Sequence, residues 1–213
     1  MERVAMDVLG PFPHSEKGNR FILVALDYFT LWPEAYALLD QEAETVAEAL
    51  LEGFLSRVGI PQELNSDQGC NFEAWVFAEM CRIQKTRTTP LHLQSDRLVE
   101  RFNRTLAVTT ANHQKDWATH LPLILLACCS AVQDITACTP ALLMMGRELR
   151  NPTEMVFGCP PDAPSAALGP EYARRLQDQL VVAHRFARDQ LQASGVWQKR
   201  NYYLRTRGHH FNA

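Results

Sequence analysis

The chain has 213 residues, of which 46% are hydrophobic and 21% are charged, and its formal net charge at pH 7 is −3. This composition excludes a wholly disordered chain, and the slightly acidic charge means that any nucleic-acid role must rest on a local basic patch. No apolar run of about 18 residues occurs, so we expect no membrane-spanning helix and no membrane partner. Asp7 interrupts the first apolar stretch, so we expect no secretory signal.

Three short apolar runs near the N-terminal end predict three strands joined by tight connections. The first run covers residues 4–9 and ends at Gly10 and Pro11. The second, residues 21–26, is continuously apolar, which is typical of a central strand buried on both faces. The third covers residues 35–38, after Pro33.

From residue 46 onward the apolar pattern changes to the period of a helix. Residues 46, 49, 50, 53 and 54 recur at i, i+3, i+4, i+7 and i+8, and Gly59 and Pro61 end this helix. Two further strands, at 62–66 and 85–88, alternate with helices at 72–83, from 95 onward and at 121–132. This order predicts an α/β fold with a five-stranded mixed sheet flanked by helices.

The C-terminal quarter of the chain has a different composition. Residues 152–170 are rich in Pro, Ala and Gly, and residues 172–191 have the pattern of a helix. Between positions 174 and 207 there are eight Lys or Arg residues and two acids. We therefore expect a core over 1–160, a linker over 161–171, and a basic helical extension over 172–213.

Three acidic residues are candidates for chemistry. Asp7 lies within a strand, Asp67 directly follows the fourth strand, and Glu100 lies in the first turns of a helix. Strand ends and helix starts meet at one edge of an α/β sheet, where three carboxylates repel each other unless a divalent cation lies between them. The alternative interpretation is that Asp67 only forms a turn and Glu100 only complements the helix dipole.

The cysteines do not indicate a zinc site. The sequence contains no CxxC pair, and no histidine stands at a zinc-finger spacing from a cysteine. We expect small buried residues at all six positions, Cys70, Cys81, Cys128, Cys129, Cys138 and Cys159.

Longer motifs carry a family resemblance over about residues 1 to 160. The stretches DVLGPFP, GNRFILVALDYFTLWPEAYAL, GIPQELNSDQGCNF, KTRTTPLHLQSD and LVERFNRTL occur in this order. Together they resemble the integrase core of gypsy-type LTR retrotransposons, in the retroviral integrase superfamily. The resemblance implies a ribonuclease-H-like fold and a site for Mg²⁺ or Mn²⁺. Its metal-binding and catalytic residues would be Asp7 in MDVLGP, Asp67 in NSDQG and Glu100 in LVERFN.

The resemblance also implies an activity, partners and a location. The activity would be cleavage and joining of DNA strands by two-metal phosphoryl transfer, with no covalent protein–DNA intermediate and no small-molecule substrate. The partners would be DNA and a second copy of the chain, paired through the core. Action on chromosomal DNA places such a protein in the nucleus.

Five further residues are DNA-binding candidates. The resemblance implies that the helix carrying Glu100 runs along viral DNA, and Asn103 and Arg104 share the face of Glu100 by helical spacing. We expect the apolar side chains of residues 98, 102 and 106 on the opposite face. A second interpretation is that Arg104 only pairs with Glu100. The remaining candidates belong to or follow the loop at 90–96 that resembles the catalytic loop of the family: Gln94, Ser95 and Arg97.

The sequence also departs from the family pattern. Only 32 residues separate Asp67 from Glu100, which is shorter than the usual spacing. In the loop motif HLQSDR, Leu93 replaces a proline and Arg97 replaces a glycine. Two interpretations therefore stay open, a working strand transferase and an inactive retroelement-derived remnant that binds nucleic acid or protein.

Overall fold

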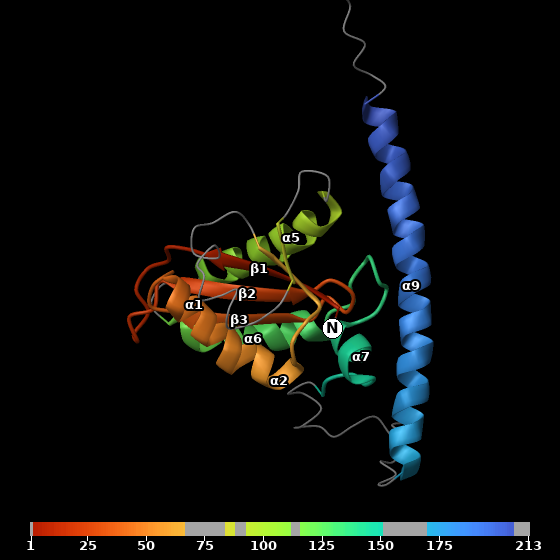
Figure 1. Cartoon of the computed structure of the whole chain (residues 1–213), viewed down its shortest axis with the longest axis horizontal. Coiled ribbons are helices and arrows are strands. Elements are labelled where there is room, and N and C mark those ends of the chain that lie inside the picture. Colours follow the sequence, from red (N-terminus) through yellow and green to blue (C-terminus); the bar gives the residue numbers. More distant parts are fainter. Residues whose placement is uncertain (1, 67–83, 88–92, 112–115, 151–169, 207–213) are drawn as a thin grey trace, which may run out of the picture. The chain divides into compact units, whose positions relative to one another are not determined.

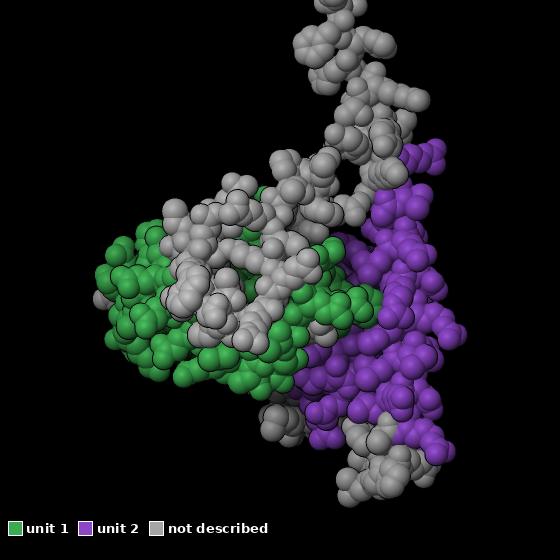
Figure 2. Space-filling view, in the orientation of Figure 1, with its two compact units in different colours: residues 1–129 green, residues 130–213 purple. Residues whose placement is uncertain are grey.

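The computed structural model describes residues 2–66, 84–87, 93–111, 116–150 and 170–206. The chain divides into two compact units, residues 1–129 and residues 130–213 (Figure 2). The helix predicted at 72–83 and most of the predicted linker, 161–169, lie outside the described residues. None of the described helices combines the length and the apolar character that crossing a membrane requires.

The first unit interleaves strands and helices, and each predicted strand is confirmed to within two residues (Figure 1). Its described elements are, in chain order, β1 (Arg3–Leu9), β2 (Phe21–Asp27), β3 (Pro33–Leu38), α1 (Ala43–Ala49), η1 (Leu50–Leu55), α2 (Ser56–Val58), β4 (Glu63–Ser66), β5 (Gln84–Arg87), α5 (Leu93–Ala111) and α6 (Trp117–Ser130).

The strands form one mixed sheet in the order β3-β2-β1-β4-β5. The pairs β1–β2 and β2–β3 are antiparallel, whereas β1–β4 and β4–β5 are parallel. The mixed α/β sheet that the element order predicts is therefore confirmed. β1 lies at the centre, between the antiparallel and the parallel part.

Helices cover both faces of the sheet because the buried strands are apolar on both sides. One face packs against α1 and η1, where Leu50 and Phe54 are fully buried on β1 and β2 side chains. The other face packs against α5 and α6 through Leu106, Trp117 and Leu121. Residues 22–26 of β2 are buried throughout, as expected for a strand covered on both sides.

The first helix differs from the prediction. It begins as an α-helix, widens into the π-helical segment η1, and ends with the short turn α2 at Gly59, whose φ is 82°. Both Phe54 and Leu55 are buried, although a uniform helical period of 3.6 residues predicts burial of Phe54 and not of Leu55. A side chain at Gly53 would place a Cβ atom 2.5 Å from the Tyr36 ring, so glycine lets the segment lie close to β3.

The second unit contains the short helix α7 (Pro140–Met145) and the long helix α9 (Pro170–Thr206). Thr139 caps α7 by accepting a hydrogen bond from the Leu142 backbone nitrogen, and Gly146 ends it with a φ of 70°. His184 of α9 donates from Nε2 to the Leu143 carbonyl oxygen at 2.8 Å, which joins the two helices. The predicted C-terminal helix is confirmed, and it extends well past residue 191.

Candidate active site on the central strand

Asp7 lies on β1, opposite Val24 of β2. Successive side chains of a strand point to opposite faces, so Asp7 lies on the other side of the sheet from Met6, which faces α1 and η1. The Asp7 carboxylate is half-buried on the α5 side, and its Oδ1 accepts a hydrogen bond of 2.9 Å from the Val8 backbone nitrogen. The acid that interrupts the apolar strand is therefore located at the centre of the sheet.

Asn103 of α5 contacts this carboxylate directly. Its Nδ2 donates a hydrogen bond of 2.5 Å to Asp7 Oδ2. The Asn103 residue is 9% exposed, and its Oδ1 is buried with no hydrogen-bond partner among the described residues. Asn103 thus orients one carboxylate oxygen of Asp7 and carries an unsatisfied polar oxygen next to it.

The packing of α5 explains the place of Asn103. Leu106, three residues later, is fully buried against β2 and α6, and Phe102 packs against the same cluster. Thr110, two turns after Asn103, is also buried. We predicted that Asn103 lies on the face of the helix opposite the apolar side chains. This prediction is wrong, because Asn103 lies with Leu106 on the side of α5 that covers the sheet.

Glu100 lies three residues before Asn103, about one helical turn along α5, and its side chain is exposed. Arg104 is exposed as well. No ion pair joins Glu100 and Arg104, both of which belong to the described part of the chain. The structure therefore does not support the interpretation that Arg104 serves only to pair with Glu100.

Asp67 lies outside the described residues, but the chain immediately before it is described. Ser66, the last residue of β4, is paired in parallel with Met6, the residue before Asp7. The register thus brings the end of β4 alongside the part of β1 that carries Asp7.

The start of α5 also differs from the prediction. The helix begins at Leu93, so residues 93–96 are helical although a loop was expected over 90–96. Gln94, Ser95 and Arg97 all fall on α5, and their side chains lie outside the described residues. Glu100 accordingly lies seven residues, about two turns, after the first residue of the helix.

The candidate site suits a hard divalent cation in its donor chemistry. Asp7 and Glu100 offer carboxylate oxygens, which are the ligands that Mg²⁺ and Mn²⁺ prefer, and Asn103 has an unsatisfied oxygen nearby. Among the described residues there is no cluster of three His, Cys, Asp or Glu side chains that would hold a metal. The predicted ligand set includes Asp67, which is not among them.

Sequence reasoning missed the direct contact between Asn103 and Asp7, and it missed α7. For α7 a local signal exists, because Thr139 and Pro140 are typical of the start of a helix and Gly146 of its end. For Asn103 the only local signal is its place between Glu100 and the buried Leu106.

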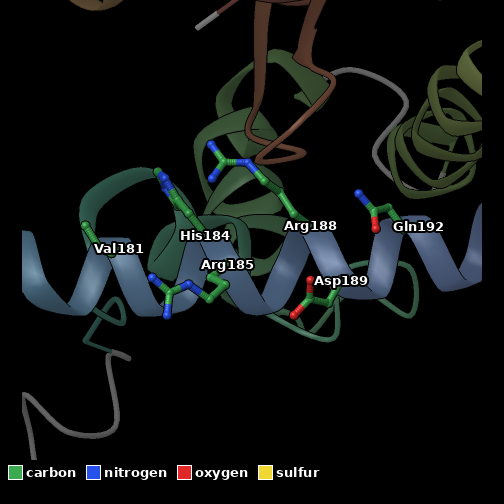
Figure 3. A pocket seen from close by; sticks show the side chains of 6 residues that line it. All are labelled: Val181, His184, Arg185, Arg188, Asp189 and Gln192. Atoms are coloured by element: carbon green, nitrogen blue, oxygen red, sulfur yellow. The ribbon is translucent and has the colours of Figure 1, made fainter.

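A second polar region lies on α9. Figure 3 shows six side chains of this helix around a hollow, among them His184, Arg185, Arg188 and Asp189. Arg185 and Asp189 leave the helix on one side, whereas His184 and Arg188 leave it on the other. The basic character predicted for the C-terminal extension is thus displayed on more than one side of α9.

The mixed sheet, which helices cover on both faces and whose central strand carries an acid, has the ribonuclease-H-like fold of retroviral integrase catalytic cores. The structure is similar to the catalytic core of BIV integrase, with a TM-score of 0.53 and 28% identity over 65% of this chain and 90% of that core. It is also similar in fold to the HTLV-2 integrase catalytic core in complex with magnesium, with a TM-score of 0.52, 18% identity, and coverage of 65% and 93% of the two chains.

The sequence is homologous to retroviral and transposon Pol and Gag-Pol polyproteins. It is 26% identical over 225 aligned positions to the retrovirus-related Pol polyprotein from transposon 412 of Drosophila melanogaster, covering 97% of this chain. It is 36% identical over 164 positions to the Gag-Pol polyprotein of Woolly monkey sarcoma virus, covering 72% of this chain. The chain spans only 17% and 9% of the length of these two polyproteins. No model of a protein family matches the sequence.

Proposed function

We propose that this chain is the catalytic core of a gypsy-type retroelement integrase that cleaves and joins DNA strands. The observation that carries the proposal is the place of Asp7, on the central strand and oriented by the Asn103 amide. A carboxylate held in one orientation on the central strand is a preorganised ligand for a cation. Homology to retroviral and transposon polyproteins supports the reaction class.

Asp7, Asp67 and Glu100 would hold Mg²⁺ or Mn²⁺ ions. These ions, when bound, would activate a water or a DNA 3′-hydroxyl and stabilise the leaving 3′-oxygen. The chain's own contribution is to hold Asp7 through Asn103 and to carry Glu100 on the same helix, one turn away. DNA would be bound by Gln94, Ser95 and Arg97 at the start of α5 and by Arg104 on the exposed side of this helix. Asn103 would contact DNA in addition to donating its hydrogen bond to Asp7.

The remaining parts of the proposal concern partners and location. The substrate would be DNA and not a small molecule, two copies would pair through the core, and the chain would act in the nucleus. Solved relatives include an intasome of simian T-cell lymphotropic virus and a trimeric form of the HTLV-2 core, which supports assembly of this class of domain.

The experiment is Mn²⁺-dependent cleavage and joining of a branched DNA substrate by the chain and three variants, Asp7→Asn, Asp67→Asn and Glu100→Gln. We expect activity in the chain and a loss of at least a hundredfold in every variant. Glu48→Gln, on the exposed side of α1 across the sheet, is the matched control and keeps its activity. A second measurement, the Mn²⁺-induced rise in melting temperature without DNA, is expected to disappear in Asp7→Asn.

A second candidate function is supported by the short interval of 32 residues between Asp67 and Glu100. Displacing a catalytic group by about 1 Å can cost a hundredfold in rate. In this case the chain is an inactive retroelement-derived remnant that binds nucleic acid or a partner protein. A folded chain that binds DNA but shows no Mn²⁺-dependent reaction would favour this second function.

A further inference from the structure

Helix α9 concentrates positive charge in a chain that is acidic elsewhere. Residues 170–206 include seven Lys or Arg and three Asp or Glu, a formal net charge of +4, whereas the rest of the chain carries −7. This basic segment is a single helix of 37 residues, which is about 55 Å long. A long cationic helix on an acidic protein indicates a polyanionic ligand, because the charge of the rest of the chain repels such a ligand.

Three arginines of α9 share one narrow side of the helix. With 3.6 residues per turn, Arg174, Arg185 and Arg188 lie within about 60° of one another around the helix axis. All three side chains are exposed. Val181 and Gln192 fall in the same sector and are exposed as well. We call these five residues the arginine stripe, and none of them is an acid.

Two arginines of the stripe flank a hollow on α9. The hollow has a volume of about 380 Å³, and Val181 and Gln192 are among the residues that line it. Figure 3 shows that Arg185 and Arg188 leave the helix on different sides of this hollow. A guanidinium group is a planar fork of N–H donors that suits phosphate oxygens. The two side chains can therefore contact a phosphodiester backbone from both sides.

The guanidinium groups of Arg174 and Arg185 have no partner within the part of the chain that the structure describes. Asp189, one turn after Arg185, lines the same hollow, but no ion pair joins these two described side chains. An exposed ion pair at this spacing contributes little stability, so Asp189 is a weak competitor for a phosphate group.

We propose that the arginine stripe binds the phosphate backbone of duplex DNA, with the DNA on the side of Arg188. Asp178 and Asp189 lie just beyond Arg185 around the helix, so the acids of α9 are confined to the other flank of the stripe. Arg174 and Arg185 are 11 residues apart, about 16 Å along the helix. This distance corresponds to about five nucleotides of one DNA strand.

The inference rests on the proposed function in naming DNA as the polyanion, and it adds a DNA-contacting surface that is separate from α5. An anionic membrane and an acidic protein segment carry the same sign of charge. DNA is favoured because it presents phosphates at a regular spacing to arginines that are regularly placed on one straight helix. The tests measure binding in EDTA, so they do not depend on whether strand joining occurs.

The first test is binding of a fluorescent DNA duplex to the whole chain at increasing salt concentration. The double variant Arg185→Gln with Arg188→Gln is expected to bind about tenfold more weakly at low salt. It is also expected to reduce the slope of log K against log salt concentration by about two. A chain that shows this loss but no Mn²⁺-dependent reaction keeps the inference and contradicts the proposed strand joining.

The matched control removes the same charge from α9 outside the stripe. Arg175 and Arg200 are exposed, and each lies at least about 60° around the helix from Arg185. Arg175→Gln with Arg200→Gln is expected to change the salt slope by less than half as much. Equal slopes for the two double variants, or an unchanged slope in Arg185→Gln with Arg188→Gln, would overturn the proposal.

The second test uses the acid beside the hollow. Asp189→Asn removes the negative charge next to Arg185 and is expected to tighten DNA binding several-fold at low salt. Glu48→Gln removes the same charge from an exposed position of α1 and is expected to leave binding unchanged. The proposal fails if Asp189→Asn binds DNA no more tightly than Glu48→Gln does.

The third test locates the contact and identifies the polyanion. A photo-reactive phenylalanine analogue at Gln192 is expected to crosslink to the duplex, whereas the same analogue at Ala193, about 100° around the helix, is not. Crosslinks from Ala193 alone, or from neither position, would contradict the stripe. Displacement of the duplex by phosphatidylserine vesicles or by polyglutamate at equal charge concentration would overturn the assignment to DNA.

Discussion

Asn103 and Asp7 are 96 residues apart in the sequence, and the Asn103 amide nitrogen donates a hydrogen bond of 2.5 Å to Asp7 Oδ2. The bond joins the long helix α5 to the central strand β1, on the face that α6 also covers. Because the other amide atom, Oδ1, is buried without a partner among the described residues, Asn103 is not optimised for stability alone. We interpret it as a residue that positions the carboxylate.

The first prediction concerns Asn103→Leu. The variant loses a hydrogen bond to a charged group, worth about 1.5–3 kcal/mol, but it also removes a buried unsatisfied oxygen, whose cost is about 1–3 kcal/mol. We therefore expect the free energy of unfolding to change by no more than about 2 kcal/mol, while strand joining falls at least tenfold. Urea unfolding and the branched-DNA assay measure the two quantities.

If Asn103 had only a structural role, its variants would show a different combination of stability and activity. In that case Asn103→Leu lowers stability and activity together, and Asn103→Gln does not recover activity. If the amide positions Asp7, Asn103→Gln keeps a donor and is expected to recover part of the activity, with a larger effect on the Mn²⁺ concentration at half-maximal rate than on DNA binding.

The sequence predicted Asp7 and did not predict its partner, for a physical reason. An aspartate inside an apolar strand is conspicuous on its own, because burial of an unpaired carboxylate is costly. Asn103 is one polar residue among several on α5, and helical spacing alone grouped it with the exposed Glu100 and Arg104. Its burial follows from the packing of Leu106 against β2, a contact between distant parts of the chain that periodicity cannot reveal.

The element order was predictable because the strands are apolar runs between turn residues. The widening of the first helix into η1 could not be predicted from the sequence, because it depends on the packing of Leu50, Phe54 and Leu55 into the same core. Helix α7 has only six residues, too few for a helical period to be recognised.

The second prediction concerns the contact between α7 and α9. Gly146 has a φ of 70°, and a Cβ atom there would lie 2.8 Å from side-chain atoms of both Leu176 and Leu180. Gly146→Ala therefore strains the backbone and forces α9 away, and we expect a loss of about 1–3 kcal/mol in the stability of the second unit. Hydrogen exchange of the α9 backbone amides measures this loss.

Gly195→Ala is the matched control for this prediction. Gly195 lies inside α9, and a Cβ atom added there has no neighbour within 4 Å. Because alanine is a better helix former than glycine, we expect a gain of about 0.5–1 kcal/mol. Equal effects of the two substitutions would contradict the inferred contact.

The third prediction concerns alkaline pH. Burial, together with the nearby Cys128 and Glu34, raises the pKa of the Cys129 thiol from about 9 to about 12. Below pH 9 both the folded and the unfolded chain keep this proton, so the stabilisation is fully present. Above pH 9 the unfolded chain releases the proton first, and the free energy of unfolding falls by at most about 1.4 kcal/mol per pH unit until about pH 12.

Cys129→Ala tests this dependence. The variant is expected to lose stability less steeply between pH 9 and pH 11 than the parent, measured by urea unfolding at each pH. Burial raises the pKa of the Cys128 thiol as well, so part of the slope remains. Identical slopes for parent and variant would show that the Cys129 proton does not contribute.

The last prediction concerns Arg104, which is exposed on α5 one turn after Glu100. If the exposed side of α5 lies along DNA, Arg104 neutralises a phosphate, and its removal weakens binding to all sequences alike. We expect Arg104→Ala to weaken DNA binding several-fold at low salt and to reduce the slope of log K against log salt concentration by about one. Arg57→Gln removes the same charge from α2, on the opposite face of the sheet, and is expected to leave the slope unchanged. If Arg57→Gln reduces the salt slope as much as Arg104→Ala does, DNA binding depends on the net charge of the chain and not on the exposed side of α5.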